Sequence, residues 1–173
     1  MNQTILAHWL RRVLEIMTTL AKAGLVLTAL FAVSAAALTI LGGRFGPIHA
    51  NFEWRLVLPA ILGAFLLFIG LVYIADRLKH IFASLEAGDP FIDENANRLK
   101  QIALCLGALE LGRYAIKMLT FIILQIFGQP ENGELGINID PSLIAWGAVV
   151  ILAILAQVFK EGARLRRNDQ LTI

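Results

Sequence analysis

Hydrophobic positions along this chain gather into four long runs that are separated by polar segments. The runs cover residues 20–41, 56–75, 102–127 and 143–159. A helix needs about 20 apolar residues to cross the hydrocarbon core of a bilayer. Backbone groups inside lipid have no water to bond, so each run is predicted to be a helix. The pattern predicts an all-α integral membrane protein, a four-helix bundle that forms a single domain over residues 1–173.

Amphipathic patterns extend these runs on one side of the membrane. Within residues 3–19, apolar side chains recur at helical spacing opposite a charged face, which predicts a helix at the inner membrane surface. The same spacing continues past Asp76, so the second helix is predicted to run beyond the membrane and to stop at Gly88. Asp89 is then predicted to be the N-cap of the next helix, with Pro90 at its first position.

Lys and Arg residues are distributed unequally between the two sides of the membrane. The side that holds both termini and the loop 76–101 carries eleven of them: Arg11, Arg12, Lys22, Arg77, Lys79, Arg98, Lys100, Lys160, Arg164, Arg166 and Arg167. The other side carries Arg44 and Arg55. Cytoplasmic loops carry the excess of positive charge, so both termini, the loop and the tail 160–173 are predicted to be cytoplasmic. This topology accounts for the net charge of +2, and no direct contact with nucleic acid is expected.

Two features of the runs leave alternatives open. Residues 34–37 look like the cleavage site of a signal peptide, but the apolar run continues to Leu41 and about 20 residues precede it, so a retained helix is favoured. The first and third runs are separated by a similar number of residues as the second and fourth. This spacing is consistent with duplication of one helical hairpin, although any four evenly spaced helices would produce it.

Composition excludes several classes of protein. The chain is 58% hydrophobic and 16% charged, with a mean hydropathy of +0.72, which is too apolar for a soluble globule or a disordered chain. One cysteine and three scattered histidines do not predict a disulfide framework or a metal site. No phosphate-binding loop, nucleophile elbow or zinc-protease motif occurs. We therefore expect no catalytic residues, no cofactor and no metal, and a protein that is not an enzyme.

Two motifs carry a resemblance to a known family. The first, Gly88-Asp89-Pro90-Phe91-Ile92-Asp93-Glu94-Asn95-Ala96-Asn97-Arg98-Leu99, has the form G-x-P-F-x-x-E-N-x-x-R-L. The second, Phe159-Lys160-Glu161-Gly162-Ala163-Arg164-Leu165, is followed by Asp169-Gln170-Leu171-Thr172-Ile173. Both resemble the DUF2975 family of small four-span bacterial membrane proteins, whose function is unknown. The resemblance implies a bacterial inner membrane. Members are often encoded beside small helix-turn-helix regulators, which implies a regulator as partner.

Charged residues within the third run form the first candidate site. Glu110, Arg113 and Lys117 fall on one stripe of a helix, and Tyr114 and Gln125 lie near it. A charge at the bilayer centre costs roughly 2.5–3.5 kcal/mol, so this helix needs partners or a face turned to the bundle interior. Three interpretations remain open: an internal structural network, a docking site for another membrane subunit or a lipid headgroup, and a path for transport.

Two further sets of residues are candidates for contacts. Small residues repeat every fourth position along the first run, which permits close packing of helices, either within the bundle or in a homo-oligomer; they are Gly24, Thr28, Ala32 and Ala36. The cytoplasmic loop and tail offer exposed aromatic and charged groups for docking a partner. They comprise Pro90, Phe91, Asp93, Glu94, Asn95, Arg98, Arg164, Arg166, Arg167, Leu171 and Ile173. Leu171 and Ile173 are favoured to pack back onto the loop.

Three functional hypotheses follow. The first is a non-catalytic membrane anchor or sensor whose cytoplasmic loop and tail dock a cytosolic regulator. The second is an accessory subunit of a larger membrane complex, and the third is a small transporter or channel. Few polar residues occur in the first, second and fourth runs, which weighs against transport.

Overall fold

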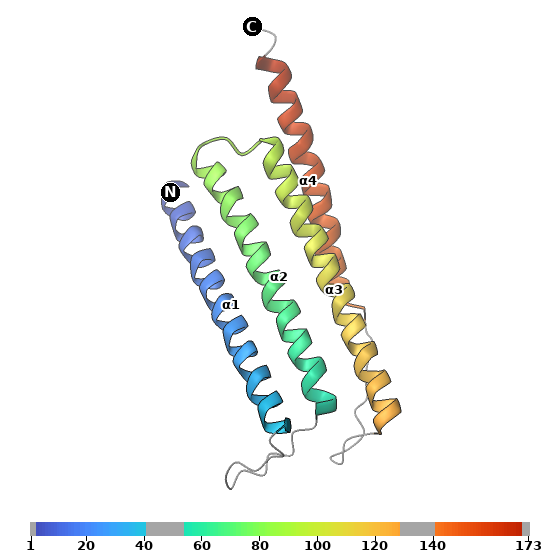
Figure 1. Ribbon diagram of the computed structural model, residues 1–173. Coiled ribbons are helices and arrows are strands. Elements are labelled where there is room, and N and C mark those ends of the chain that lie inside the picture. The colour runs from blue at the N-terminus through green and yellow to red at the C-terminus, as the bar shows by residue number, and fades with distance from the viewer. Residues whose placement is uncertain (1–2, 41–53, 129–140, 171–173) are drawn as a thin grey trace.

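Four helices make up the described part of the chain. The computed structural model describes residues 3–40, 54–128 and 141–170, and within these ranges it has no strand. The helices are α1 (Gln3–Ile40), α2 (Trp54–Glu86), α3 (Asp93–Phe127) and α4 (Leu143–Gln170). They run alternately up and down the molecule (Figure 1). The prediction of an all-α fold with four helices is therefore confirmed.

Three of the helices are long and apolar enough to cross a membrane. They contain the segments Arg12–Ala37, Arg55–Glu86 and Leu143–Asn168, which lie in α1, α2 and α4. In α1, the predicted amphipathic lead-in and the first apolar run form one continuous helix of 38 residues. In α2, the helix continues past Asp76 as predicted and ends at Glu86. α3 is not among the three, and it is the helix that carries Glu110, Arg113 and Lys117.

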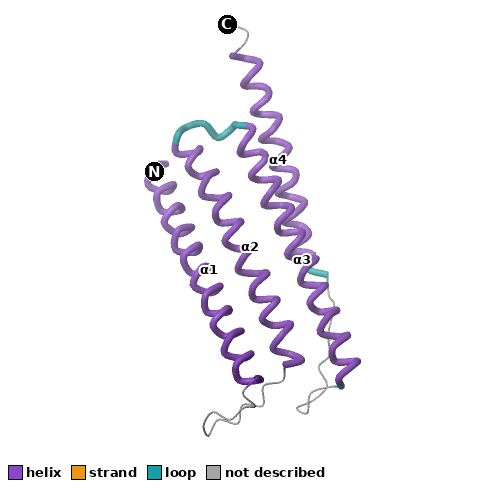
Figure 2. The backbone as a smooth tube through the Cα atoms, in the orientation of Figure 1, coloured by secondary structure: helices purple, strands orange, loops and turns teal. Residues whose placement is uncertain are grey.

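The helices are arranged as an open row. α1 packs against α2, α2 against α3, and α3 against α4, and no other pair of the described helices is in contact. Figure 2 shows the order α1, α2, α3 across the molecule, with α4 alongside α3. α3 therefore lies between two helices that can span a membrane, and we infer that it lies at the same depth. The hairpin duplication stays a prediction, although each half does form a packed hairpin.

Glycines let neighbouring helices approach closely. A Cβ atom added to Gly24 of α1 would lie 2.4 Å from the Phe68 ring of α2, and one added to Gly70 of α2 would lie 2.5 Å from Leu109 of α3. Gly24 therefore faces α2, which favours packing within the bundle for the stripe of small residues. Farther along α1, Ala36 is exposed while its neighbour Ala35 is buried. The stripe of small residues therefore turns away from α2 along the helix.

The remaining small residues of this stripe lie at the edge of the α1–α2 interface. Thr28 and Ala32 are half-buried. The Thr28 hydroxyl donates a hydrogen bond to the Gly24 carbonyl oxygen one turn earlier, which satisfies this hydroxyl within its own helix.

Both ends of the chain and the connection between α2 and α3 lie at the same end of the molecule (Figure 1). We call this end the loop end. There, α2 stops at the predicted glycine: Gly88 has a φ of +76°, and its N–H bonds the Leu85 carbonyl at 3.1 Å. The Asp89 N–H bonds the Ser84 carbonyl at 3.1 Å, which completes a Schellman motif.

The predicted start of α3 is wrong. The helix begins at Asp93, its N-cap is Ile92 with an extended backbone (φ −113°, ψ 148°), and no side chain caps it. Asp89 and Pro90 instead belong to the connection, which stays non-helical for residues 89–92. The physical reason is a tertiary contact, since this extended stretch carries Phe91 onto α4.

Candidate functional site

The α2–α3 connection is fastened to α4 by an aromatic contact. The Phe91 ring lies 5.3 Å from the Phe159 ring, tilted by 42°. The Phe91 ring also lies over Gly162, where an added Cβ would be 2.8 Å from Phe91 Cδ1. A glycine at position 162 is therefore the residue that lets this ring pack onto α4. The two motifs quoted above for the family resemblance contact each other here.

Two ion pairs reinforce this contact. Arg166 pairs with Asp89 in the connection, and Arg167 pairs with Asp93 in the first turn of α3. Exposed ion pairs each contribute little stability, with a median of about 0–1 kcal/mol. Their effect here is geometric, because they fix the position of α4 relative to the connection. We name the surface formed by residues 87–94 and 159–167 the loop–tail platform.

Asn95 is the buried anchor of the platform. Its side chain is fully buried at 0% exposure and donates hydrogen bonds to Ser84 Oγ at 2.5 Å and to the Pro90 carbonyl at 2.9 Å. Asn95 Oδ1 accepts a bond from Arg98 at 2.7 Å. The sequence prediction placed Asn95 among exposed docking residues, and this part of the prediction is wrong. The side chain turns inward because it ties α2, the connection and α3 together.

Replacing Asn95 with alanine is expected to destabilise the protein by about 1–3 kcal/mol, because the Ser84 hydroxyl and the Pro90 carbonyl lose a buried partner. Thermal unfolding in mild detergent and proteolysis of the 87–92 connection measure this loss. Lys100→Ala is the control, since Lys100 lies on the same helix with an exposed side chain and should change stability by less than about 0.5 kcal/mol. Equal effects of the two substitutions would contradict the role given to Asn95.

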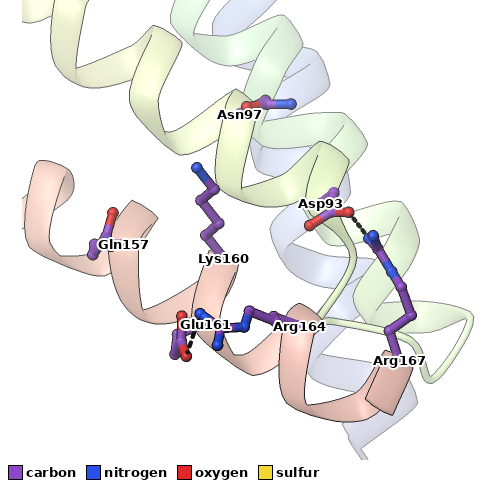
Figure 3. A pocket seen from close by; sticks show the side chains of 7 residues that line it. All are labelled: Asp93, Asn97, Gln157, Lys160, Glu161, Arg164 and Arg167. Carbon is purple, nitrogen blue, oxygen red and sulfur yellow. Dashed lines mark hydrogen bonds and ion pairs between the residues drawn. The ribbon is translucent and has the colours of Figure 1, made fainter. Parts of the chain in front are cut away.

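Two hollows flank α4 at the loop end. The loop cleft has a volume of about 250 Å³ and lies on the platform, where Phe91, Glu94 and Arg166 contribute to its lining. The α3–α4 groove has a volume of about 580 Å³; it shares Asp93 and Arg167 with the loop cleft, but Asn97, Gln157 and Lys160 line the groove alone. Figure 3 shows the side chains of this groove, with Lys160 rising from α4 toward α3 and Asn97.

The platform presents the chemistry of a binding surface. Phe91 is 43% exposed although part of its ring contacts α4. Glu94 is exposed on the first turn of α3, and no ion pair joins it to another described residue. Aromatic and arginine side chains are the residue types that most often anchor protein interfaces. An exposed ring next to a carboxylate and two guanidinium groups is therefore suited to bind another protein.

The charged stripe of α3 forms a second polar cluster, about halfway along the helix. Glu110 is 7% exposed, and its carboxylate accepts bonds from Arg113 Nε at 3.0 Å and Nη2 at 2.5 Å. The Tyr114 hydroxyl donates to the same carboxylate at 2.9 Å. Three of the five predicted stripe residues are thus joined by hydrogen bonds, which favours the internal-network interpretation. Gln125 is exposed two turns beyond Lys117 and does not join them.

The start of α4 lies against this cluster. The Ser142 N–H donates to the Tyr114 hydroxyl at 3.3 Å, and the Ser142 hydroxyl accepts from the Ala145 N–H at 3.2 Å. Negative charge is favoured near the N-terminus of a helix, so α4 adds to the stabilisation of the Glu110 carboxylate. The cluster faces a largely apolar cavity of about 290 Å³, which is lined by Glu110, Arg113 and Lys117 of α3 and by residues of α2 and α4 that include Gly63 and Ala145.

The structure places the other predicted docking residues in different roles. Arg98 donates hydrogen bonds to Asn95 Oδ1 and to the His80 carbonyl. Arg164 is exposed and pairs with Glu161 at 3.4 Å. Leu171 and Ile173 lie outside the described residues.

Sequence reasoning missed the roles of Phe159 and Gly162, for which a signal was present, and of Lys160, for which there was none. A phenylalanine in one motif and a glycine in the other could have been paired, because an aromatic ring commonly packs where a facing residue has no side chain. The position of Lys160 in the groove depends on how α4 is aligned with α3, and no motif reports that alignment.

Fold and composition together define a helical membrane protein. The comparison with known families then identifies it more closely: the chain belongs to the family of proteins of unknown function DUF2975, which it matches over residues 43–173. The match covers both motifs of the loop–tail platform. No curated protein and no solved structure is significantly similar to the chain.

Proposed function

We propose that this protein is a non-catalytic membrane anchor or sensor of the bacterial inner membrane, and that its loop–tail platform docks a cytosolic regulator. The observation that carries the proposal is the contact between the two motifs at the loop end, where Phe91 of one packs on Phe159 and Gly162 of the other. The contact gathers an exposed ring, a carboxylate and two arginines on one surface. Because the platform is already held together in the free protein, binding a partner would cost little conformational entropy.

Topology supports the cytosolic placement of the platform. The two chain ends and the connection lie at one end of the molecule (Figure 1). Lys and Arg are concentrated in the segments of this end, which in membrane proteins face the cytoplasm. A soluble partner would then reach the platform from the cytosol, while the apolar faces of α1, α2 and α4 contact lipid.

Partner capture tests the proposal. A Phe91→Ala/Glu94→Ala double variant is expected to reduce recovery of a cytosolic partner from gently solubilised membranes at least about tenfold, because loss of an interface anchor costs about 2 kcal/mol or more. The matched control is Trp9→Ala/Arg12→Ala, which also removes one charge and one exposed aromatic side chain from the loop-end half of the molecule, outside the platform.

Two results bear on this test. If the platform variant recovers the same cytosolic protein as the unchanged chain, the platform is not the docking surface.

Glu94→Lys is the second variant, because the exposed Glu94 side chain makes no ion pair with a described residue and its replacement should leave the fold intact. A partner that tolerates both platform variants but is lost with the control would also contradict the proposal.

A further inference from the structure

The α3–α4 groove contains a lysine, Lys160, whose charge is not neutralised by an acid of the described residues. Each acid in its lining is already paired with an arginine, Asp93 with Arg167 and Glu161 with Arg164. Lys160 forms no ion pair with any described residue. The groove therefore carries one positive charge more than its acids neutralise.

The side chains near Lys160 are hydrogen-bond donors. Asn97 of α3 and Gln157 of α4 line the groove with it. In Figure 3 the Lys160 side chain extends across the groove toward Asn97 and away from Glu161. An ammonium group between two amides is a suitable site for a phosphate group, since lysine binds phosphate as a point charge and amide N–H groups complete the contacts.

The groove lies where a lipid headgroup would be. Lys160 is the first charged residue after the apolar segment 143–159 of α4, a position that falls at the edge of the hydrocarbon core. Basic pockets between membrane helices at this level bind anionic headgroups.

An apolar surface continues from the groove toward the middle of the helices. Residues three or four positions apart share one face of a helix, so Leu104 follows Asn97 along α3, and Ala153 and Val150 follow Gln157 along α4. Leu104 is 64% exposed and Val150 is 55% exposed. Polar groups for a headgroup and an apolar strip for an acyl chain thus lie end to end on one flank of the α3–α4 pair.

We propose that the α3–α4 groove binds an anionic phospholipid, with its phosphate held by Lys160, Asn97 and Gln157 and an acyl chain along Leu104 and Val150. This site adjoins the loop cleft but extends beyond it, because Asp93 and Arg167 line both hollows whereas Lys160, Asn97 and Gln157 line the groove alone. The lipid would join α3 to α4 just beneath the platform.

Fluorescence quenching by brominated lipids tests this site. The chain has three tryptophans, and in a Trp9→Phe/Trp54→Phe background the only fluorophore of this type is Trp146, one helical turn beyond Val150 on the same flank. The protein is reconstituted into phosphatidylcholine vesicles that contain either brominated phosphatidylglycerol or brominated phosphatidylcholine. The anionic lipid is expected to quench Trp146 at a lower mole fraction than the zwitterionic one.

Two substitutions separate a specific site from general attraction to negative lipid. Lys160→Gln is expected to lower the relative binding constant for phosphatidylglycerol about tenfold, the loss of one hydrogen bond to a charged group. Asn97→Ala is expected to lower it several-fold without any change of charge. Lys100→Gln is the control, because it removes an exposed charge outside the groove and should have the smaller effect of about 1 kcal/mol or less, roughly fivefold.

Three results would overturn the proposal. Equal quenching by the two lipids would show no preference for the anionic headgroup. If Lys100→Gln and Lys160→Gln lower the binding constant for phosphatidylglycerol equally and Asn97→Ala does not lower it, the lipid is attracted by net charge alone. Displacement of the lipid by inorganic phosphate at constant ionic strength would show that the groove takes the free ion, whereas resistance to phosphate supports the lipid.

Discussion

Glu110→Ala is expected to destabilise the folded protein by about 3–5 kcal/mol, the largest effect of any substitution considered. The carboxylate is 7% exposed and accepts two bonds from Arg113 and one from the Tyr114 hydroxyl. Its removal takes away the carboxylate that accepts two hydrogen bonds from the Arg113 guanidinium group, in a helix flanked by apolar neighbours. Unfolding by increasing concentrations of SDS, followed by circular dichroism in mild detergent, measures the loss.

A double substitution provides the control for Glu110. Replacing a buried ion pair by two apolar residues is often neutral or stabilising, so Glu110→Leu/Arg113→Leu should recover most of the stability that Glu110→Ala loses. This recovery is expected only if the pair is a structural network. If the double variant is as unstable as the single one, the two residues do not act as a neutralising pair, and the transport and docking interpretations of the stripe regain support.

Gly70→Val is expected to cost about 3 kcal/mol, at the upper end of the range for overpacking a tight contact. The Cβ alone would lie 2.5 Å from both terminal carbons of Leu109 and 2.8 Å from its Cγ, so the whole side chain of Leu109 would have to move. Because Leu109 of α3 fills the space next to Gly70 of α2, the two helices would separate there. The same SDS titration measures the effect.

Gly107→Val is the matched control, because a Cβ at Gly107 of α3 meets nothing within 4 Å. This substitution should change stability by less than about 0.5 kcal/mol. Combining Gly70→Val with Leu109→Ala should cost less than the sum of the two single changes, since each relieves part of the other's misfit. Strict additivity would contradict direct packing of Leu109 on Gly70.

The helices could be predicted from sequence because the bilayer imposes a simple rule. Residues 143–159 carry no charge and are apolar at every position except Gln157, and a single chain segment that crosses lipid is helical. The stop at Gly88 was also predictable, since a positive φ at the end of a helix favours glycine. The extension of α2 beyond its apolar run followed from the periodicity of apolar residues past Asp76.

The platform could be predicted only in part. Its residue types were evident from Phe91, Asp93, Glu94 and the basic tail, but the capping signal of Asp89-Pro90 gave the wrong start for α3. Tertiary contacts override the local preference of Asp89-Pro90 to begin a helix, because Phe91 packs on α4 and Asp89 pairs with Arg166. Asn95 was wrongly predicted to be exposed for the same reason. Its burial depends on Ser84 and Pro90, which surround it only after α2 and α3 pack.

The open row and the groove lay beyond sequence reasoning. Periodicity reports which face of a helix is apolar, but in a membrane an apolar face suits lipid and protein equally well. The chain therefore gave no indication that α1 contacts α2 alone, or that Lys160 lies opposite Asn97. Both depend on the alignment of whole helices, which the contacts at Gly70 and Gly162 help to set.

Docking of a cytosolic protein on the loop–tail platform is tested most directly by photo-crosslinking in intact cells. A photoreactive phenylalanine analogue is placed at Leu165, an exposed position on the platform, and in a second strain at Lys100, an exposed position of α3 outside it. We predict a single soluble protein crosslinked from position 165, absent from position 100, and lost when Phe91→Ala is added. No adduct at position 165, or the same adducts at both positions, would contradict a cytosolic partner on the platform.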